Sequence, residues 1–162
     1  MPDLLPKAAP GLTRNPERAN VLEVEIASDP VETRRVQEEI EQRLKAQSFE
    51  EREIFCIKLA LEEALVNAIK HGNQLNRAKK VRVAYRVDGE RFEVLIADEG
   101  PGFNPADVPD PVAIENLERP CGRGLLLMRH YMSEVVFHPP GNAVHMVKLR
   151  APAVERNGYV KT

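Results

Sequence analysis

The sequence contains little cysteine, no tryptophan and no long hydrophobic run. Its two cysteines, Cys56 and Cys121, are too few for a disulfide framework and lack the spacing of metal ligands. We therefore expect reduced thiols, as in a cytoplasmic protein. No apolar segment approaches the roughly 18 residues that a transmembrane helix requires, and the N-terminal residues lack the apolar stretch of a secretory signal. The sequence thus predicts a cytoplasmic protein without a membrane partner.

Neither sign of charge is in large excess. The formal net charge is -2, and the basic residues form only a short cluster at Lys79, Lys80 and Arg82. A nucleic-acid-binding protein normally shows a larger basic surface, so we expect no direct nucleic-acid partner. The sequence contains no Gly-x-x-x-x-Gly-Lys-Ser/Thr motif, so it gives no support for a phosphate-binding P-loop.

The length of 162 residues suits one domain with one core. Residues 1–19 carry four prolines and little periodicity, so we interpret them as a flexible N-terminal arm. Residues 20–150 contain the periodic segments and are expected to form the domain. Residues 151–162 are expected to form a loose C-terminal tail.

The first part of the domain predicts a strand followed by a helix. Residues 21–26 alternate in part between apolar and polar side chains, which indicates a half-buried strand. Asp29 is a suitable N-cap before Pro30 at the first helical position, and the helix is expected to run to about Gln47. We expect its apolar side chains to lie near one face: Val31, Val36, Ile40 and Leu44.

A second helix is predicted between Ser48 and Gly72. Ser48 and Glu51 have the spacing of a capping box, and Gly72 is a typical glycine stop. Glu63 and Asn67 fall on the side opposite to the core face, together with two apolar residues, so that side is not plainly solvated. The core face is expected to comprise Ile54, Ile57, Leu61, Ala64, Leu65 and Ala68.

A β-hairpin and a long loop come next. Residues 81–87 alternate cleanly, and the turn residues that follow lead to a second apolar strand at residues 92–97. Residues 103–121 are rich in proline and aspartate and predict a loop, within which a short helix is expected around residues 112–117.

The last part of the domain predicts a helix and a second hairpin. Residues 124–132 form an apolar helix, and residues 135–138 and 143–149 form the two strands of the hairpin. The order is therefore β-α-α-β-β-loop-α-β-β. Because hairpins dominate, we predict an α/β two-layer sandwich with a mostly antiparallel mixed sheet and helices on one face.

Glu63 and Asn67 are the first pair of residues that suggests a chemistry. They are four residues apart on the second helix, so their side chains lie one above the other. The amide oxygen of Asn67 suits Mg²⁺, a hard cation that binds oxygen ligands and substrate phosphates. The Glu63 carboxylate can orient or deprotonate a hydroxyl that attacks a phosphate. Taken alone, such a pair more often simply faces water.

Asp98 begins a second patch, at the end of an apolar strand and before Gly100 and Gly102. An ionised carboxylate only accepts hydrogen bonds, so it suits an exocyclic amine such as adenine N6. The two glycines let the backbone turn sharply and approach a flat base. The alternative interpretation is an ordinary turn, because Asp, Gly and Pro are common there.

A third patch consists of Gly122, Arg123, Gly124 and Leu125 at the start of the later helix. Backbone N–H groups at a helix start attract phosphates, and glycines remove the Cβ atoms that would hinder the approach. Arg123 can add a charge-assisted contact. Leu125 and the apolar residues after it are more typical of a core, and the alternative interpretation of the patch is a flexible helix entry.

All three patches occur together, in order, on a helix, at a strand end and at a helix start. Residues 63–72 (EALVNAIKHG) resemble the N box of the GHKL ATPases (gyrase, Hsp90, histidine kinase, MutL). Residues 98–103 (DEGPGF) and 122–128 (GRGLLLM) resemble their two glycine boxes. The run at residues 67–73 narrows the resemblance to the bacterial anti-sigma factor serine-protein kinases, over residues 21–150.

This resemblance implies a Bergerat-type sandwich that binds ATP and Mg²⁺. Glu63 would act as general base, Asn67 would hold Mg²⁺ and Asp98 would hold the adenine. The loop at residues 103–121 would be the lid over the phosphates. His71 could contact phosphate or could only cap its helix. The further nucleotide contacts implied are Gly100, Gly102, Gly122, Arg123, Gly124 and Leu125.

The resemblance also implies partners. The substrate would be a serine or threonine on a small STAS-type antagonist, the second partner would be a sigma factor, and the kinase would often be a homodimer. The sequence departs from the family pattern in two places. Family members often have Thr or Ser in the last hairpin turn, where this chain has Asn142 and Ala143. Cys121 stands where small or polar residues are usual.

Three functions therefore remain open at the level of the sequence. The first is an ATP-dependent serine kinase that also sequesters a sigma factor. The second is a catalytically silent module that binds a partner under the control of ATP, to which a proline-stiffened lid would be suited. The third is an unrelated α/β adaptor with accidental glycine loops.

Overall fold

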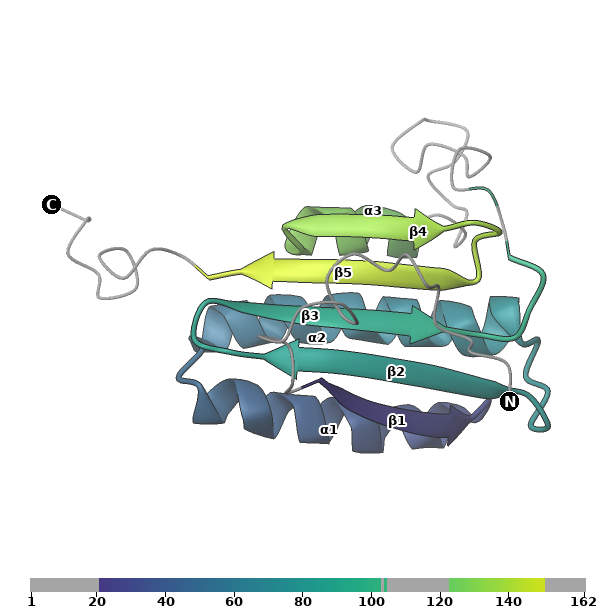
Figure 1. The fold of residues 1–162 in the computed structure, drawn as a ribbon, viewed down its shortest axis with the longest axis horizontal. Helices are drawn as coiled ribbons and strands as arrows, with labels where there is room; N and C mark the ends of the chain where they lie inside the picture. Colours follow the sequence, from purple (N-terminus) through teal and green to yellow (C-terminus); the bar gives the residue numbers. More distant parts are fainter. Residues whose placement is uncertain (1–20, 103, 105–122, 151–162) are drawn as a thin grey trace, which may run out of the picture.

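A five-stranded sheet is the centre of the fold (Figure 1). The structure is a computed structural model that describes residues 21–102, 104 and 123–150. The sheet has the order β1-β2-β3-β5-β4, and each of its pairings is antiparallel. Its strands are β1 (Leu22–Ala27), β2 (Lys80–Val87), β3 (Arg91–Ala97), β4 (Glu134–His138) and β5 (Ala143–Leu149).

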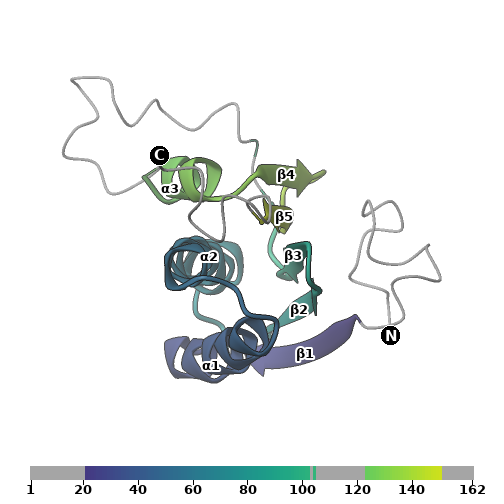
Figure 2. The ribbon, with the colours of Figure 1, turned by 90° about the vertical axis from the view of Figure 1, so that its left-hand side faces the viewer.

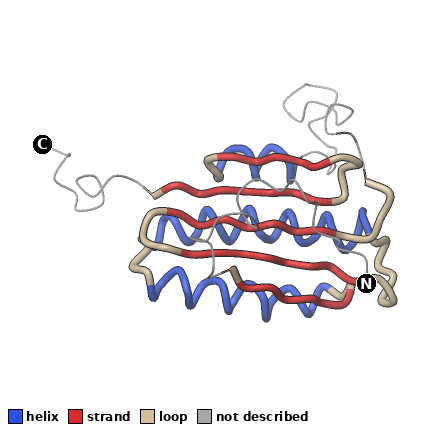
Figure 3. Tube along the Cα trace, in the orientation of Figure 1, coloured by secondary structure: helices blue, strands red, loops and turns tan. Residues whose placement is uncertain are grey.

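The helices of the described residues lie on one face of this sheet (Figure 2). Figure 3 shows the same helices behind the plane of the strands. The expected two-layer α/β sandwich with a mostly antiparallel sheet is thereby confirmed. The helical elements are α1 (Pro30–Ala46), α2 (Glu51–Val66), the π-helical turn η2 (Asn67–Gly72) and α3 (Arg123–Tyr131).

Helix α1 begins as the sequence predicts. Asp29 is its N-cap, and the Oδ1 atom of Asp29 accepts a hydrogen bond of 3.0 Å from the N–H of Val31. Val36, Ile40 and Leu44 are buried. The placement of Val31 on the same face is wrong, because its exposed fraction is 77%. Val31 precedes Val36 by five residues, which turns its side chain about 140° away around the helix.

The start of α2 also differs from the prediction. Its N-cap is Glu50, whose N–H donates to Glu53 Oε1 at 3.1 Å, and not Ser48. Ser48 has a φ of 59° and its N–H donates to Lys45 O at 2.9 Å. An N-cap residue needs an extended backbone, so Ser48 in the left-handed region closes α1 instead of opening α2.

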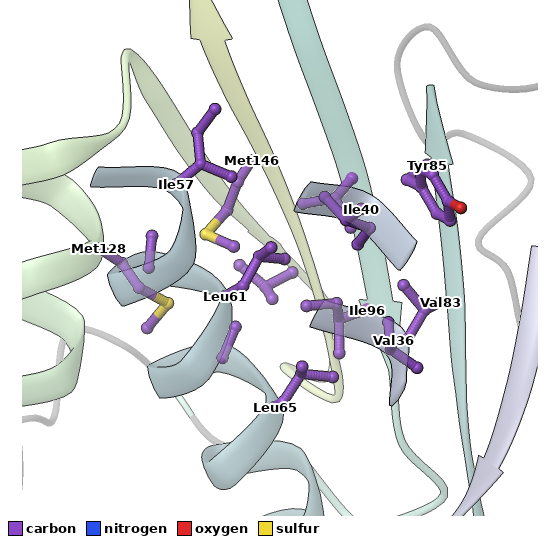
Figure 4. Close-up of a cluster of buried hydrophobic side chains, with 14 of the residues drawn as sticks. Val36, Ile40, Ile57, Leu61, Leu65, Val83, Tyr85, Ile96, Met128 and Met146 are labelled. Atoms are coloured by element: carbon purple, nitrogen blue, oxygen red, sulfur yellow. The ribbon is translucent and has the colours of Figure 1, made fainter. Parts of the chain in front are cut away.

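The core lies between the sheet and the helices. Figure 4 shows Ile57, Leu61 and Leu65 of α2 among side chains of the strands and Met128 of α3. The predicted core face of α2 is confirmed, because all of its members are buried: Ile54, Ile57, Leu61, Ala64, Leu65 and Ala68. This packing fixes α2 against the sheet and leaves its other side for the site.

Both predicted hairpins are present. In the first, β2 and β3 pair with Val87 opposite Phe92, and the N–H of Asp88 donates to Arg91 O at 3.0 Å. In the second, β4 and β5 pair with His138 opposite Ala143. No helix of the described ranges combines the length and the apolar composition that a bilayer crossing needs.

Several predicted features lie outside the described residues. They are the N-terminal arm at 1–19, the lid with its short helix at 112–117, Cys121, Gly122 and the tail at 151–162. The other cysteine, Cys56, is a free thiol that is partly buried.

The burial pattern of α1 gives a matched pair of tests. Replacing Val36 with alanine should lower the free energy of unfolding by about 2 kcal/mol, because carbon atoms leave a packed core and a cavity remains. Replacing Val31 with alanine should change it by less than about 0.5 kcal/mol, because that side chain faces solvent. Urea denaturation of both variants measures the difference, and equal losses would contradict the orientation of α1.

Candidate functional site

Helix α2 runs without a break into the π-helical turn η2, and the first candidate pair stands at this junction. The N–H of Asn67 donates to the carbonyl oxygens of Glu63 and Ala64, so one helical turn separates Glu63 from Asn67. Both side chains are partly buried. The end of this run at Gly72 is as predicted, but the wider π turn is not. Such turns are rare in proteins, and those that occur often lie at functional sites.

Glu63 lies against the start of α3. A Cβ atom built on Gly124 would be 2.5 Å from Glu63 Oε2, so the first and third patches are in contact. Burial raises the pKa of Glu63, and the neighbouring charge of Glu62 raises it further. A carboxylate with a raised pKa is a better proton acceptor than an ordinary surface glutamate.

Asp98 lies against the other end of the same helical run. A Cβ atom on Gly72 would be 2.3 Å from Asp98 Cγ, and one on Gly100 would be 2.1 Å from Gly72 O. Only glycine at these two positions permits this close approach of backbone and carboxylate. The second patch is therefore in contact with the helical run that also carries Glu63 and Asn67.

The Asp98 carboxylate is largely removed from water. Its exposed fraction is 8%, and its Oδ1 atom accepts a hydrogen bond of 2.7 Å from the N–H of Gly100. Burial raises the pKa of Asp98 to about 6, while the bond from Gly100 and the charge of Lys79 oppose this shift. A desolvated carboxylate of this kind is suited to one directed hydrogen bond from a ligand.

Two asparagines that the sequence did not mark as site residues hold the Asp98 turn. The side chain of Asn73 accepts a hydrogen bond of 2.8 Å from the N–H of Glu99. The main-chain carbonyl of Asn142 accepts a hydrogen bond of 2.8 Å from the N–H of Asp98, and the side-chain Nδ2 atom of Asn142 donates to Gly100 O at 3.3 Å. The sequence signals for Asn73 were its position directly after the glycine stop and its place in the run 67–73 that narrows the resemblance, and neither indicates its partners.

The remaining predicted residues have different surroundings. Gly102 has a φ of +83°, and a Cβ atom there would be 2.2 Å from Pro140 O, so the turn lies against the last hairpin. His71 is exposed on η2. Leu125, with an exposed fraction of 8%, belongs to the hydrophobic core and supports the site by packing. Arg123 begins α3, and its contact with a phosphate stays a prediction.

Comparison with known proteins identifies the family. Residues 26–148 match the histidine kinase-like ATPase domain. The chain belongs to this family. It is 31% identical to the serine-protein kinase RsbW of Bacillus subtilis over 117 residues, which cover 67% of this chain and 73% of that relative. The earlier resemblance to GHKL ATPases of the serine-protein kinase group is thereby confirmed.

Two further relatives are more partial. RsbW of Staphylococcus aureus is 28% identical over 110 residues, which cover 62% of this chain and 69% of that protein. The serine/threonine-protein kinase BtrW of Bordetella bronchiseptica is 30% identical over 80 residues, which cover 48% of this chain and little more than half, 56%, of that relative.

A solved structure shares the fold of this ATPase domain. It contains the RsbU and RsbW domains of a Mycobacterium tuberculosis protein, and it superposes with a TM-score of 0.56 at 17% identity. The match covers 82% of this chain and 33% of that longer chain. It confirms the arrangement of sheet and helices.

The burial of Asp98 should be measurable as a pH-dependent cost in stability. Folding raises the pKa of this carboxyl from 3.8 to about 6, so the folded state binds more protons than the unfolded state between these values. Stability therefore falls as pH rises through this window and stays reduced above it. Asp98→Asn removes the charge and should gain stability relative to wild type, on the order of 2 kcal/mol, at pH 8 but not at pH 4.

Thermal unfolding without nucleotide at a series of pH values measures this difference. A stability difference between Asp98→Asn and wild type that stays constant from pH 4 to pH 8 would show that the Asp98 carboxylate is not desolvated.

Proposed function

We propose that this chain is an ATP-dependent serine/threonine-protein kinase and an anti-sigma factor. The observation that carries the proposal is the position of the Glu63 carboxylate, one helical turn before Asn67 and against the backbone of Gly124. The similarity to RsbW and BtrW, which are named as protein kinases, supports it.

The adenine end of the site would be built around Asp98. Its carboxylate would accept a hydrogen bond from the exocyclic amine of the base, because an ionised Asp offers only acceptors. The close approach of Gly72 to Asp98 and Gly100 supports the assignment, since it brings the proposed adenine contact beside η2. The phosphates would then extend along the helical run toward Glu63 and the start of α3.

Asn67 is the residue that would hold Mg²⁺. The described part of the chain contains no group of three or more His, Cys, Asp or Glu side chains that could hold a metal ion. A single amide oxygen fits Mg²⁺ nevertheless, because this ion is commonly bound by one or two protein oxygens together with phosphates and water. When bound, Mg²⁺ would neutralise charge on the phosphates.

The chemical step would be carried by positioning and by one proton acceptor. The hydroxyl oxygen of a substrate serine or threonine would form a bond to the γ-phosphorus of ATP, and the bond to ADP would break. The hydroxyl proton would pass to the carboxylate of Glu63, whose raised pKa favours this role. Backbone N–H groups at the start of α3, beside Gly124, would orient the phosphate oxygens.

The proposed physiological setting is cytoplasmic transcription regulation. The phosphate acceptor would be a small STAS-type antagonist. The second partner, which the kinase would bind and sequester, would be a sigma factor. The active unit would be a homodimer. A catalytically silent, ATP-gated binding module is the alternative, and detection of phosphate transfer by the wild-type protein decides between them.

Glu63→Gln tests the proposed base. This variant should lose phosphate transfer by about 10²- to 10⁴-fold, because the amide cannot accept the proton, while it keeps its affinity for nucleotide. The measurement is transfer of labelled γ-phosphate from ATP to STAS-domain proteins of the same organism, with ADP affinity measured by calorimetry.

Glu51→Gln is the matched control, because Glu51 is an exposed glutamate in the first turn of the same helix, twelve residues before Glu63. It should transfer phosphate at nearly the wild-type rate. No transfer by a wild-type protein that binds ATP tightly would overturn the kinase proposal and favour the ATP-gated module.

The adenine contact can be tested by the pH dependence of ADP binding. Because Asp98 must be ionised and its pKa is about 6, wild-type affinity should fall about tenfold for each pH unit below that value. Asp98→Asn should bind ADP weakly at every pH. Titration of the ADP phosphates affects both proteins alike, so the affinity ratio of wild type to variant isolates Asp98. A ratio near one throughout would exclude the adenine contact.

A further inference from the structure

The turn at residues 98–100 is anchored at each of its backbone N–H groups. The N–H of Asp98 donates to Asn142 O at 2.8 Å, and that of Glu99 donates to Asn73 Oδ1 at 2.8 Å. The N–H of Gly100 donates to Asp98 Oδ1 at 2.7 Å. The position of the carboxylate therefore depends on the side chain of Asn73 and on the main-chain carbonyl of Asn142, which come from distant parts of the chain.

Asn73 is the more deeply placed of the two, with an exposed fraction of 0%. Its Nδ2 atom donates to Ser28 Oγ at 2.8 Å and to Lys80 O at 3.0 Å. Its own N–H donates to Ala68 O at 2.8 Å, which ties it to η2. One residue thus joins η2, the end of β1, the start of β2 and the turn after β3.

The chemistry of this network defines the orientation of the amide. The Oδ1 atom faces an N–H group, while both hydrogens of Nδ2 face oxygen atoms, the Ser28 hydroxyl and the Lys80 carbonyl. No hydrophobic residue can satisfy these groups, and a shorter hydroxyl side chain cannot reach all three. The asparagine amide satisfies all three groups at once, which holds the turn at this place.

We propose that Asn73, assisted by Asn142, is a positioning residue of the nucleotide site that holds the Asp98 carboxylate where it meets the exocyclic amine of adenine. This inference rests on the proposed function of Asp98. It adds a residue that contacts no nucleotide itself and acts through the backbone of Glu99. Displacement of a directed contact by about 1 Å is enough to weaken it severely.

The test compares ADP with purine riboside 5′-diphosphate, which lacks the exocyclic amine. In the wild type the analogue should bind at least about tenfold more weakly, because a hydrogen bond to a charged carboxylate is lost. In Asn73→Ala this ratio should fall close to one, mainly through weaker ADP binding. Dissociation constants at pH 8 are measured by calorimetry, together with the melting temperature of each protein.

Asn76→Ala is the matched control. Asn76 is an exposed asparagine whose Oδ1 atom accepts a hydrogen bond of 3.0 Å from the N–H of Ala78. The variant loses a similar side chain to backbone bond away from the Asp98 turn. It should keep the wild-type ratio between the two ligands.

The outcomes separate the two proposals. A wild-type ratio near one would mean that Asp98 does not read the amine, and the proposed adenine site would fail together with this inference. A large wild-type ratio that persists in Asn73→Ala, with only a lower melting temperature, would make Asn73 merely structural and overturn the inference alone. If Asn73→Ala does not fold, Asn73→Ser decides, because it keeps a polar side chain that is too short to hold all three partners: a reduced ratio supports the inference and an unchanged one overturns it.

Discussion

The close approach of Gly72 to the Asp98 carboxylate is the contact on which the candidate site depends. It joins the end of the helical run α2–η2 to the end of β3, and any side chain at residue 72 would overlap the carboxylate. The packing of α2 on the sheet fixes one partner, and the hydrogen bonds around Asn73 fix the other. Because Glu63 lies on the same run, the adenine end and the phosphate end of the proposed site are held by one continuous element.

The site has a cost that the core must offset. Burial raises the pKa of Asp98 to about 6. At neutral pH the folded protein therefore holds this carboxyl ionised, in surroundings that stabilise the charge less than water does. Buried polar groups with defined partners give directionality in return. The continuous hydrophobic cluster beneath the site supplies the stabilisation that permits this arrangement.

Local sequence patterns predicted most of the fold, since the alternating Val81, Val83 and Tyr85 and the helically spaced apolar residues in 54–68 all face the core between the sheet and the helices. The same patterns did not separate Ser48 from Glu50, because the reversal of the chain after α1 decided which residue could adopt an extended backbone. The role of Asn73 could not be predicted, since its side-chain partners at Ser28 and Glu99 are 45 and 26 residues away in the sequence. The candidate residues Glu63, Asn67 and Asp98 could be named from the sequence because they match the motifs of the GHKL ATPases in order and spacing.

The π-helical turn also has an evolutionary consequence. Asn73 bonds back to Ala68, five positions earlier, where a regular helix would bond back four. A π turn holds one residue more than the α-helical turn that it replaces, so loss of one codon between residues 67 and 72 would let the same N–H bond back four positions. The asparagine would then keep its place beside Ser28. A one-residue gap at this point among homologues is therefore compatible with the same anchor of the turn.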